Sequence, residues 1–282
     1  MAALSLAPGA GAAAVSPDAM PKGDLPGWRQ VYADDFNGYT VPKGAFTDCN
    51  HNTDTPQAYC GGLKKYPTAY ANYWAYPWGW DDTAKSGADG NTGAPFGGRY
   101  DPATTVSIGK ATAKSTDGYL SVKQYRPKAG GDNRVAAVVP RKCMGHAYGK
   151  YSERFKVVNG SDPGFKSAHL FYQGGEEIDY PEGDWVRPDR STGSFSGFVH
   201  PNQTYIDARG QWMTRWNTTS IEWTPGKISF FLNGKLVRTV NRSISKPQAW
   251  IWQNESSIEG PYAKPGASAE IRTTWATCYV RK

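Results

Sequence analysis

The chain has 282 residues, with 32 Gly, 20 Pro and 11 Trp, an apolar fraction of 39 % and a charged fraction of 20 %. This is the composition of a folded, turn-rich protein and excludes a largely disordered chain. The net charge of +7 is scattered, and no apolar run reaches the roughly 20 residues of a membrane-spanning helix, so neither a nucleic acid nor a membrane is expected as a partner.

Residues 1–24 are rich in small apolar residues and contain an Ala-x-Ala pattern, but they lack a basic start and a proper apolar core. We interpret them as a disordered leader or the remnant of a secretory signal. Residues 25–282 are expected to form a single domain, because all-β domains often reach this length. The resulting expectation is a secreted, extracellular protein that is a monomer.

The four cysteines show no CxxC pair and no histidine at zinc spacing, so a metal site built on them is not expected. An even count in an exported chain favours two disulfides. Cys49 and Cys60 would close a short loop, which leaves Cys143 to pair with Cys278. The other two pairings, and four buried thiols, stay open as alternatives.

Most of the remaining chain alternates β-branched or aromatic residues with polar ones, and Asp-Gly, Pro-Gly and Asn-Gly turn signals separate the segments. No segment keeps helical periodicity over three turns. The predicted strands lie in 106–126, 134–139, 148–158, 196–200, 219–240 and 269–282, with a hairpin turn at Asn233-Gly234. This pattern predicts an all-β sandwich of two antiparallel sheets.

Residues 44–101 differ from this pattern, because Gly, Pro, Asn and many aromatic residues replace the alternation. Long loops in compact domains are usually functional. The aromatic side chains would either stack on sugar rings or form a satellite core beneath the sandwich.

The stretch GGEEIDYPEGD at 174–184 concentrates carboxylates in an apparent strand. Strand alternation puts Glu177 and Asp179 on one face, whereas Glu182 has the wrong parity. Pro181 is tolerated in a sheet mainly at an edge or a β-bulge, and a bulge would return Glu182 to the face of the other two. Without a bulge, Glu176 and Glu182 would share a face instead.

Like charges side by side on a strand repel one another, so a merely solvated acidic strand is disfavoured. A calcium or magnesium site is a second interpretation, but no further oxygen ligands are evident nearby. Paired-carboxylate chemistry explains the cluster better, since neighbouring charges raise one pKa and let an acid and a nucleophile coexist near neutral pH.

The sequence EIDYPE at 177–182 resembles the Glu-x-Asp-x-x-Glu motif of glycoside hydrolase family 16, in its laminarinase-like β-bulge form. Flanking segments agree with that family in order. They are GWRQVYADDFNG, DGYLSVKQYR, YGKYSERFKVV, FVHP, the hairpin SIEWTPGKISFFLNGKLVRTV and CYVRK, which together run from about Trp28 to the C-terminus.

The resemblance implies a curved β-jelly-roll and retaining hydrolysis of a β-linked polysaccharide without an organic cofactor. Glu177 would be the nucleophile, Glu182 the general acid and base, and Asp179 the carboxylate that tunes the nucleophile. The default substrate is β-1,3- or mixed β-1,3/1,4-glucan. A galactan hydrolase, a transglycosylase with the same triad and a non-catalytic carbohydrate-binding protein are the alternatives.

Two departures from the family pattern are visible. FKSAHLFYQGG at 165–175 lacks the substrate-stacking Trp that many members carry before the motif. Cys278 replaces an Asp that is often linked with structural calcium, so calcium is doubtful and no metal is expected. Cys278 fits a disulfide instead.

Four further residues are candidates for substrate binding. Trp185 follows the motif and could stack on a sugar or belong to the core, and His200 could donate a hydrogen bond in the cleft. Gln253 and Glu255 share a strand face by parity and would line the cleft or lie exposed on its rim.

Overall fold

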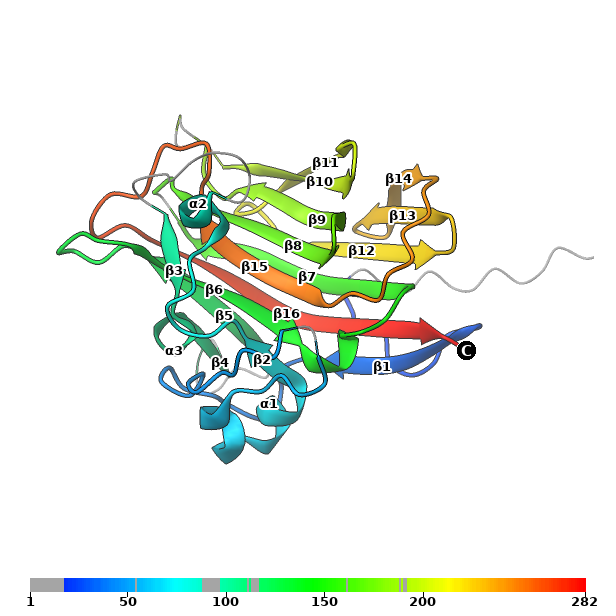
Figure 1. Ribbon diagram of the computed structural model, residues 1–282, viewed down its shortest axis with the longest axis horizontal. Coiled ribbons are helices and arrows are strands. Elements are labelled where there is room, and N and C mark those ends of the chain that lie inside the picture. Colours follow the sequence, from blue (N-terminus) through cyan, green and yellow to red (C-terminus); the bar gives the residue numbers. More distant parts are fainter. Residues whose placement is uncertain are drawn as a thin grey trace, which may run out of the picture.

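The computed structural model describes residues 18–53, 55–87, 97–110, 112, 117–160, 162–187, 189 and 192–282, in which strands dominate and helices are short (Figure 1). The helical elements are η1 (Gly61–Lys65), α1 (Pro67–Asn72), α2 (Thr83–Ser86), α3 (Pro102–Thr105) and η2 (Arg141–Cys143). The strands are β1 (Trp28–Asp34), β2 (Tyr73–Ala75), β3 (Gly98–Tyr100), β4 (Val106–Lys110), β5 (Gly118–Tyr125), β6 (Asn133–Pro140), β7 (Gly149–Asn159), β8 (Phe165–Gln173), β9 (Glu176–Asp184), β10 (Ser194–His200), β11 (Thr204–Gln211), β12 (Asn217–Thr224), β13 (Lys227–Leu232), β14 (Lys235–Val240), β15 (Trp250–Ser256) and β16 (Ser268–Arg281). Among the described helices, none has the length and apolar character needed to span a bilayer.

The strands form two curved sheets that meet at one corner. The front sheet has the order β11-β10-β9-β8-β15-β6, with β2 at the β6 edge. The back sheet has the order β4-β5-β16-β7-β12-β13-β14, with β1 beside β16. A single residue pair, Tyr125 with Arg134, joins β5 to β6. The pairing is antiparallel except between β3 and β6, which confirms the predicted all-β jelly-roll sandwich.

Aromatic side chains fill the space between the sheets, because alternate residues of each strand point inward. Phe171 of β8 packs on Tyr151 of β7 at a ring-centroid distance of 4.6 Å and stacks on Trp250 of β15. His169 of β8 also points inward, and its Nδ1 lies 2.7 Å from Oε1 of the buried Glu153 on β7. The other half of the β8 side chains therefore lies on the outer face of the front sheet.

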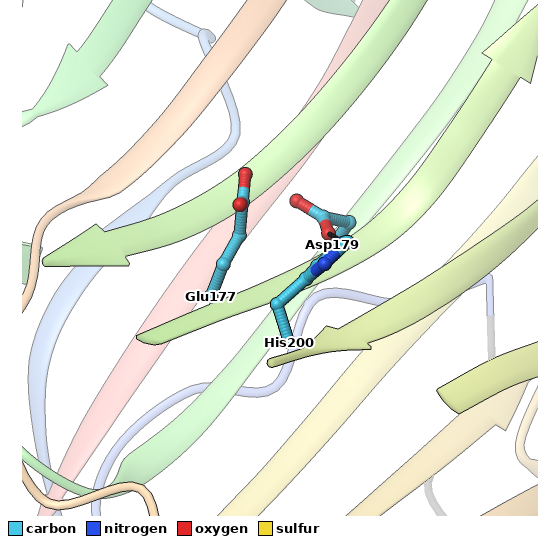
Figure 2. Close-up of side chains that lie close together, drawn as sticks. All are labelled: Glu177, Asp179 and His200. Carbon is cyan, nitrogen blue, oxygen red and sulfur yellow. Dashed lines mark ion pairs between the residues drawn. The ribbon is translucent and has the colours of Figure 1, made fainter. Parts of the chain in front are cut away.

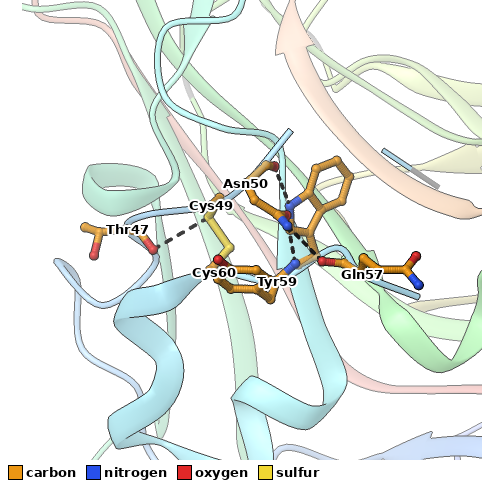
Figure 3. Close-up of a disulfide and its surroundings, with 7 residues drawn as sticks. Thr47, Cys49, Asn50, Gln57, Tyr59 and Cys60 are labelled. Atoms are coloured by element: carbon orange, nitrogen blue, oxygen red, sulfur yellow. Dashed lines mark hydrogen bonds between the residues drawn. A yellow bond between two sulfur atoms is a disulfide. The ribbon is translucent and has the colours of Figure 1, made fainter. Parts of the chain in front are cut away.

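The aromatic-rich segment 44–101 contains η1, α1, β2, α2 and β3, and is not merely loop. The Cys49–Cys60 disulfide closes a small ring near its start, where Asn50 Nδ2 donates to Gln57 O at 2.8 Å (Figure 3). The buried Trp74 of β2 donates its indole N–H to Asn50 O at 3.1 Å. This part of the segment is thus a satellite core that covers the β2 edge of the front sheet.

The second disulfide joins Cys143 of η2 to Cys278 of β16, so both expected cysteine pairings are present. The hairpin turn between β13 and β14 is also confirmed. Asn233 and Gly234 have φ values of 49° and 76°, the left-handed conformations that a two-residue turn of this type requires.

Part of the stretch 1–24, expected to be disordered, contacts the domain. Residues 1–17 lie outside the described residues, but 18–24 pack against the domain. Asp18 forms an ion pair with Arg154 at 2.9 Å, and Asp24 forms one with Lys282 at 3.2 Å. The charge pairs, which composition alone does not reveal, attach this stretch to the back sheet.

Candidate active site

A β-bulge in β9 decides which of its carboxylates share a face. On the neighbouring β8, Ala168 pairs with Glu182 and Leu170 pairs with Asp179, so two residue steps on β8 match three on β9. The other neighbour, β10, shows the same register shift. The extra residue falls at the cis peptide bond before Pro181. This confirms the bulge expected from the proline.

The bulge places Glu177, Asp179 and Glu182 together on the outer face of the front sheet. Tyr180, which lies between them in sequence, points the other way and is 1 % exposed in the core. The alternative in which Glu176 shares a face with Glu182 is therefore wrong, because it requires an uninterrupted strand.

Asp179 is the centre of a compact polar group (Figure 2). Its side chain is buried, and its Oδ2 lies 3.3 Å from Nε2 of His200. His200 is the β10 residue in register with Glu177. One oxygen or nitrogen atom from each of Glu177, Asp179 and His200 lies within 4.8 Å of the others. His200 thus contacts the triad, while its expected role as a hydrogen-bonding partner for substrate in the cleft stays a prediction.

Burial raises the pKa of Glu177 to about 8, and the negative charge and hydrogen bond of Asp179 add to the effect. The electrostatic interaction with His200 lowers the pKa of Glu177. With a pKa of about 8, Glu177 keeps its proton at neutral pH beside the carboxyl group of Asp179. The site thus holds a proton and a carboxylate side by side.

The same three side chains are the group among the described residues that could bind a metal ion. They offer two carboxylates and one imidazole, whereas calcium prefers six to eight oxygen ligands. The donor set does not fit calcium.

Glu182 pairs with the β8 residue two positions from the partner of Asp179, and it faces a cation. Its Oε1 accepts a hydrogen bond from Nζ of Lys166 at 3.1 Å, and its side chain is 20 % exposed. Glu182 is consequently the triad member that combines access to solvent with a fixed orientation.

Residues paired side by side on adjacent strands form a row across the front sheet that begins at Glu182, which we call the Glu182 row. Ala168 pairs with Gln253, Gln253 with Ala137, and the N–H of Tyr76 bonds to Ala137 O at 3.0 Å. Four strand spacings of about 4.8 Å put Tyr76 on the order of 19 Å from Glu182. The middle of the row consists of two alanines on either side of Gln253, whose Nε2 donates to Thr83 Oγ1 at 2.8 Å, and an aromatic ring lies at its far end.

Tyr76 belongs to a group that we call the edge aromatics, together with Trp80 and His51. Tyr76 and Trp80 rings lie 5.5 Å apart, and Trp80 Nε1 donates to His51 Nδ1 at 3.2 Å. The neighbouring Trp78 is 70 % exposed. This part of the segment 44–101 is therefore surface, in contrast to the buried Trp74.

No protein-family model and no curated protein matches the chain. Its fold, in contrast, matches solved structures over most of their length. The catalytic domain of PdAgaC aligns with a TM-score of 0.58 at 15 % identity and covers 96 % of both chains. A β-1,3-glucanase from Mycobacterium marinum aligns with a TM-score of 0.56 at 13 % identity, over 88 % of this chain and 98 % of that one.

A GH16 protein of the Bacteroides ovatus mixed linkage glucan PUL, in complex with a G4G4G3G product, aligns with a TM-score of 0.51 at 15 % identity. The match covers 64 % of this chain and 87 % of that one. The chain has the fold of glycoside hydrolase family 16. At such low identity the family 16 fold is shown, while the activity has to be argued from the residues of the site.

On this family 16 fold, two of the four residues considered for substrate binding are buried and cannot contact a substrate at the surface. Trp185 is fully buried and donates its indole N–H to Ser167 Oγ at 2.8 Å, so it is a core residue and does not stack on a sugar. Glu255 is 1 % exposed and accepts from Thr83 Oγ1 at 2.6 Å beneath α2, so it neither lines a cleft surface nor lies on a rim. Half-buried Gln253 lies in the Glu182 row.

Strand alternation predicted the correct face of β15 for Glu255, but it could not show that α2 covers this residue. Its buried neighbour Asp82 caps α2 by accepting from Lys85 N at 2.9 Å, and burial with the charge of Glu255 raises the pKa of Asp82 to about 6. These carboxylates anchor α2 to β15.

Lys166 is a residue of the site that the sequence did not indicate. It lies sixteen residues before Glu182, on the strand that pairs with β9, so a prediction of which strands pair would have pointed to it.

Proposed function

We propose that the chain is a retaining glycoside hydrolase that cleaves β-linked polysaccharide, with β-1,3- and mixed β-1,3/1,4-glucan as the first candidate substrates. The observation that carries this proposal is the bulge of β9, which puts Glu177, Asp179 and Glu182 on one face of a family 16 fold. Two working carboxyl groups on one face are what double displacement at a sugar requires.

Each carboxylate has a role that its surroundings support. Glu182, which is accessible and oriented by a cation, donates a proton to the glycosidic oxygen as the bond to the leaving sugar breaks. Glu177 attacks the anomeric carbon and forms an ester. Glu182 then removes a proton from water, and this water releases the sugar from Glu177.

Transfer of the Glu177 proton to Asp179 when substrate binds is the part of the proposal that reconciles the raised pKa of Glu177 with its role as nucleophile. When the proton is on Asp179, Glu177 is ionised and accepts a hydrogen bond from its neighbour. The electrostatic interaction with His200 lowers the pKa of Glu177 and so favours its ionised form. The pair thus keeps a nucleophile ionised in a partly buried site without placing two full negative charges there.

The Glu182 row, which runs to Tyr76, supports a long substrate that crosses the strands. Two of its three middle residues are alanines, Gln253 between them offers a polar side chain, and the edge aromatics offer ring faces at its far end. Sugar rings stack on aromatic side chains through their apolar faces. A polysaccharide that extends over several sugar units from the cleavage point matches this layout better than a short glycoside.

An extracellular location is part of the proposal. It is supported by the two disulfides, since such bonds persist in oxidising compartments.

The proposal is tested by incubating the protein with laminarin, lichenan, xyloglucan, agarose and an arabinogalactan, and measuring reducing ends and product lengths. Glu177→Gln should lose at least about 10⁴-fold in rate, because the nucleophile is removed. Glu176→Gln is the matched control, as it changes the adjacent carboxylate on the same strand and should retain activity. Proton NMR of the first-formed product should show a retained anomeric configuration.

Other outcomes of this assay are equally informative. Products longer than the substrate would identify a transglycosylase, and activity on agarose alone would identify a galactan hydrolase. Binding of a glycan without release of reducing ends would refute the hydrolase proposal and favour a carbohydrate-binding protein. A parallel assay with a chelator should leave the rate unchanged.

A further inference from the structure

Lys166 is a nearly buried cation in direct contact with the proposed proton donor. It lies on β8, in register with Asp184 on β9 and with Glu255 on β15. Its side chain is 11 % exposed, and its Nζ lies 3.1 Å from Glu182 Oε1. Removing an ammonium group from water is costly unless a partner compensates for it. Glu182 is a partner that the geometry provides.

The position of Lys166 is fixed from the core. Gln124 of β5 in the back sheet is fully buried and donates Nε2 to Lys166 O at 3.2 Å. The Lys166 backbone is therefore part of the sheet-to-sheet packing, and only its side chain reaches the outer face. This arrangement places the ammonium group reproducibly beside Glu182.

The surroundings of Glu182 are otherwise strongly acidic. The charged groups around it and Lys166 are Glu177, Asp179 and Asp184 on β9, His200 on β10, Glu255 on β15 and Glu259 after β15. Burial raises the pKa of Asp184, while the charge of Lys166 lowers it. In these acidic surroundings, the ion pair of Lys166 brings a lysine into contact with the triad.

We propose, on the basis of the proposed hydrolase function, that Lys166 is a positioning residue for Glu182. It holds the carboxyl group in one orientation and stabilises the negative charge that Glu182 gains on giving up its proton. In that step the Glu182 O–H bond and the glycosidic C–O bond break. A new O–H bond forms on the leaving sugar, and the electron pair of Glu177 forms the ester. Lys166 makes and breaks no covalent bond.

This role predicts a dependence on the leaving group. A sugar alkoxide leaves only with a proton, whereas 2,4-dinitrophenolate leaves without one, so support of Glu182 matters for the first and hardly for the second. Lys166→Met should lower kcat on the cleaved polysaccharide by about 10- to 100-fold with little change in KM. The same variant should keep its rate of ester formation on the dinitrophenyl glycoside of the same sugar, measured as the burst of phenolate. Lys166→Arg, which keeps the charge, should recover most of the polysaccharide activity.

The matched control is Lys150→Met, which removes another cross-strand ion pair, with Glu222 at 2.9 Å on the back sheet. It should leave both rates unchanged. An equal loss of Lys166→Met on both substrates, or no loss on either, would overturn the positioning role. If the unmodified protein cleaves no polysaccharide, it is the proposed function that fails.

A second measurement does not need activity. Unfolding temperatures of Lys166→Met, Glu182→Gln and the double variant form a cycle in which contacting partners give non-additive changes. Additive changes in a protein that hydrolyses polysaccharide would refute the pairing of Lys166 with Glu182 in solution and with it the inference.

Discussion

Nε2 of His200 lies 3.3 Å from Oδ2 of Asp179, and this contact joins β10 to the bulged strand β9 at the centre of the candidate site. Asp179 thereby has a positively polarised neighbour on one side and Glu177 on the other. Asp179 and His200 act in opposite directions on Glu177, since Asp179 raises the pKa of Glu177 and His200 lowers it. Substitution of Asp179 or of His200 therefore tests the site.

Asp179→Asn should lower the pKa of Glu177 from about 8 by about 1 unit or more, because a like charge within hydrogen-bonding distance is removed. His200→Asn should shift it upward. NMR titration of carboxyl-labelled glutamate, assigned with Glu177→Gln, measures both. An unchanged midpoint in Asp179→Asn would mean that burial alone sets the value.

The raised pKa of Glu177 also makes stability depend on pH. Between the ordinary value of 4.5 and the folded value of about 8, the folded protein binds more protons at this position than the unfolded chain. The contribution of Glu177 to stability therefore falls as pH rises through this window. Glu177→Gln removes the effect, so its unfolding temperature should exceed that of the unmodified protein by a margin that grows by a few degrees from pH 4.5 to pH 8. Parallel unfolding curves would contradict this prediction.

Trp78→Ala should weaken binding of long substrates and leave the chemistry intact. Trp78 is 70 % exposed beside the edge aromatics, so its removal costs little folding stability. Loss of a stacking contact worth about 1 kcal/mol corresponds to an increase of about 5-fold in KM for polysaccharide with kcat unchanged. Oligosaccharides too short to reach the β2 edge should show no change. Leu236→Ala on β14, 59 % exposed, is the control.

Removal of the two disulfides should have unequal effects. Cys143 and Cys278 are 135 residues apart in sequence, against 11 for Cys49 and Cys60. In the chain-entropy model the longer loop stabilises by about 5 kcal/mol and the shorter by about 3 kcal/mol. The double Ser variant of the 143–278 pair should therefore unfold at the lower denaturant concentration. The reverse order would show that the 49–60 ring has the greater effect, through its packing under Trp74.

Strand geometry explains why the triad could be predicted from the sequence. Alternation and the limits on proline are local rules, and they indicated the bulge that brings Glu182 to the face of Asp179. The turn at Asn233-Gly234 is local in the same way, because its φ values depend on two adjacent residues.

Burial, in contrast, depends on elements distant in the chain. The sequence could not show that Trp185 points into the core or that α2 covers Glu255, because both outcomes depend on packing between segments far apart. The same holds for 18–24, which ion pairs attach to the back sheet.

The fold class, the bulge and the three carboxylates could be predicted from the residues, since each follows from rules that act within one strand or turn. The surroundings of these carboxylates depend instead on how separate strands pack. Pairing of β9 with β8 and β10 brings Lys166 to Glu182 and His200 to Asp179, and pairing of β2 with β6 brings Tyr76 to the end of the Glu182 row. Charges and rings from separate strands act on one another only through space, so their effect appears once the strands are in register.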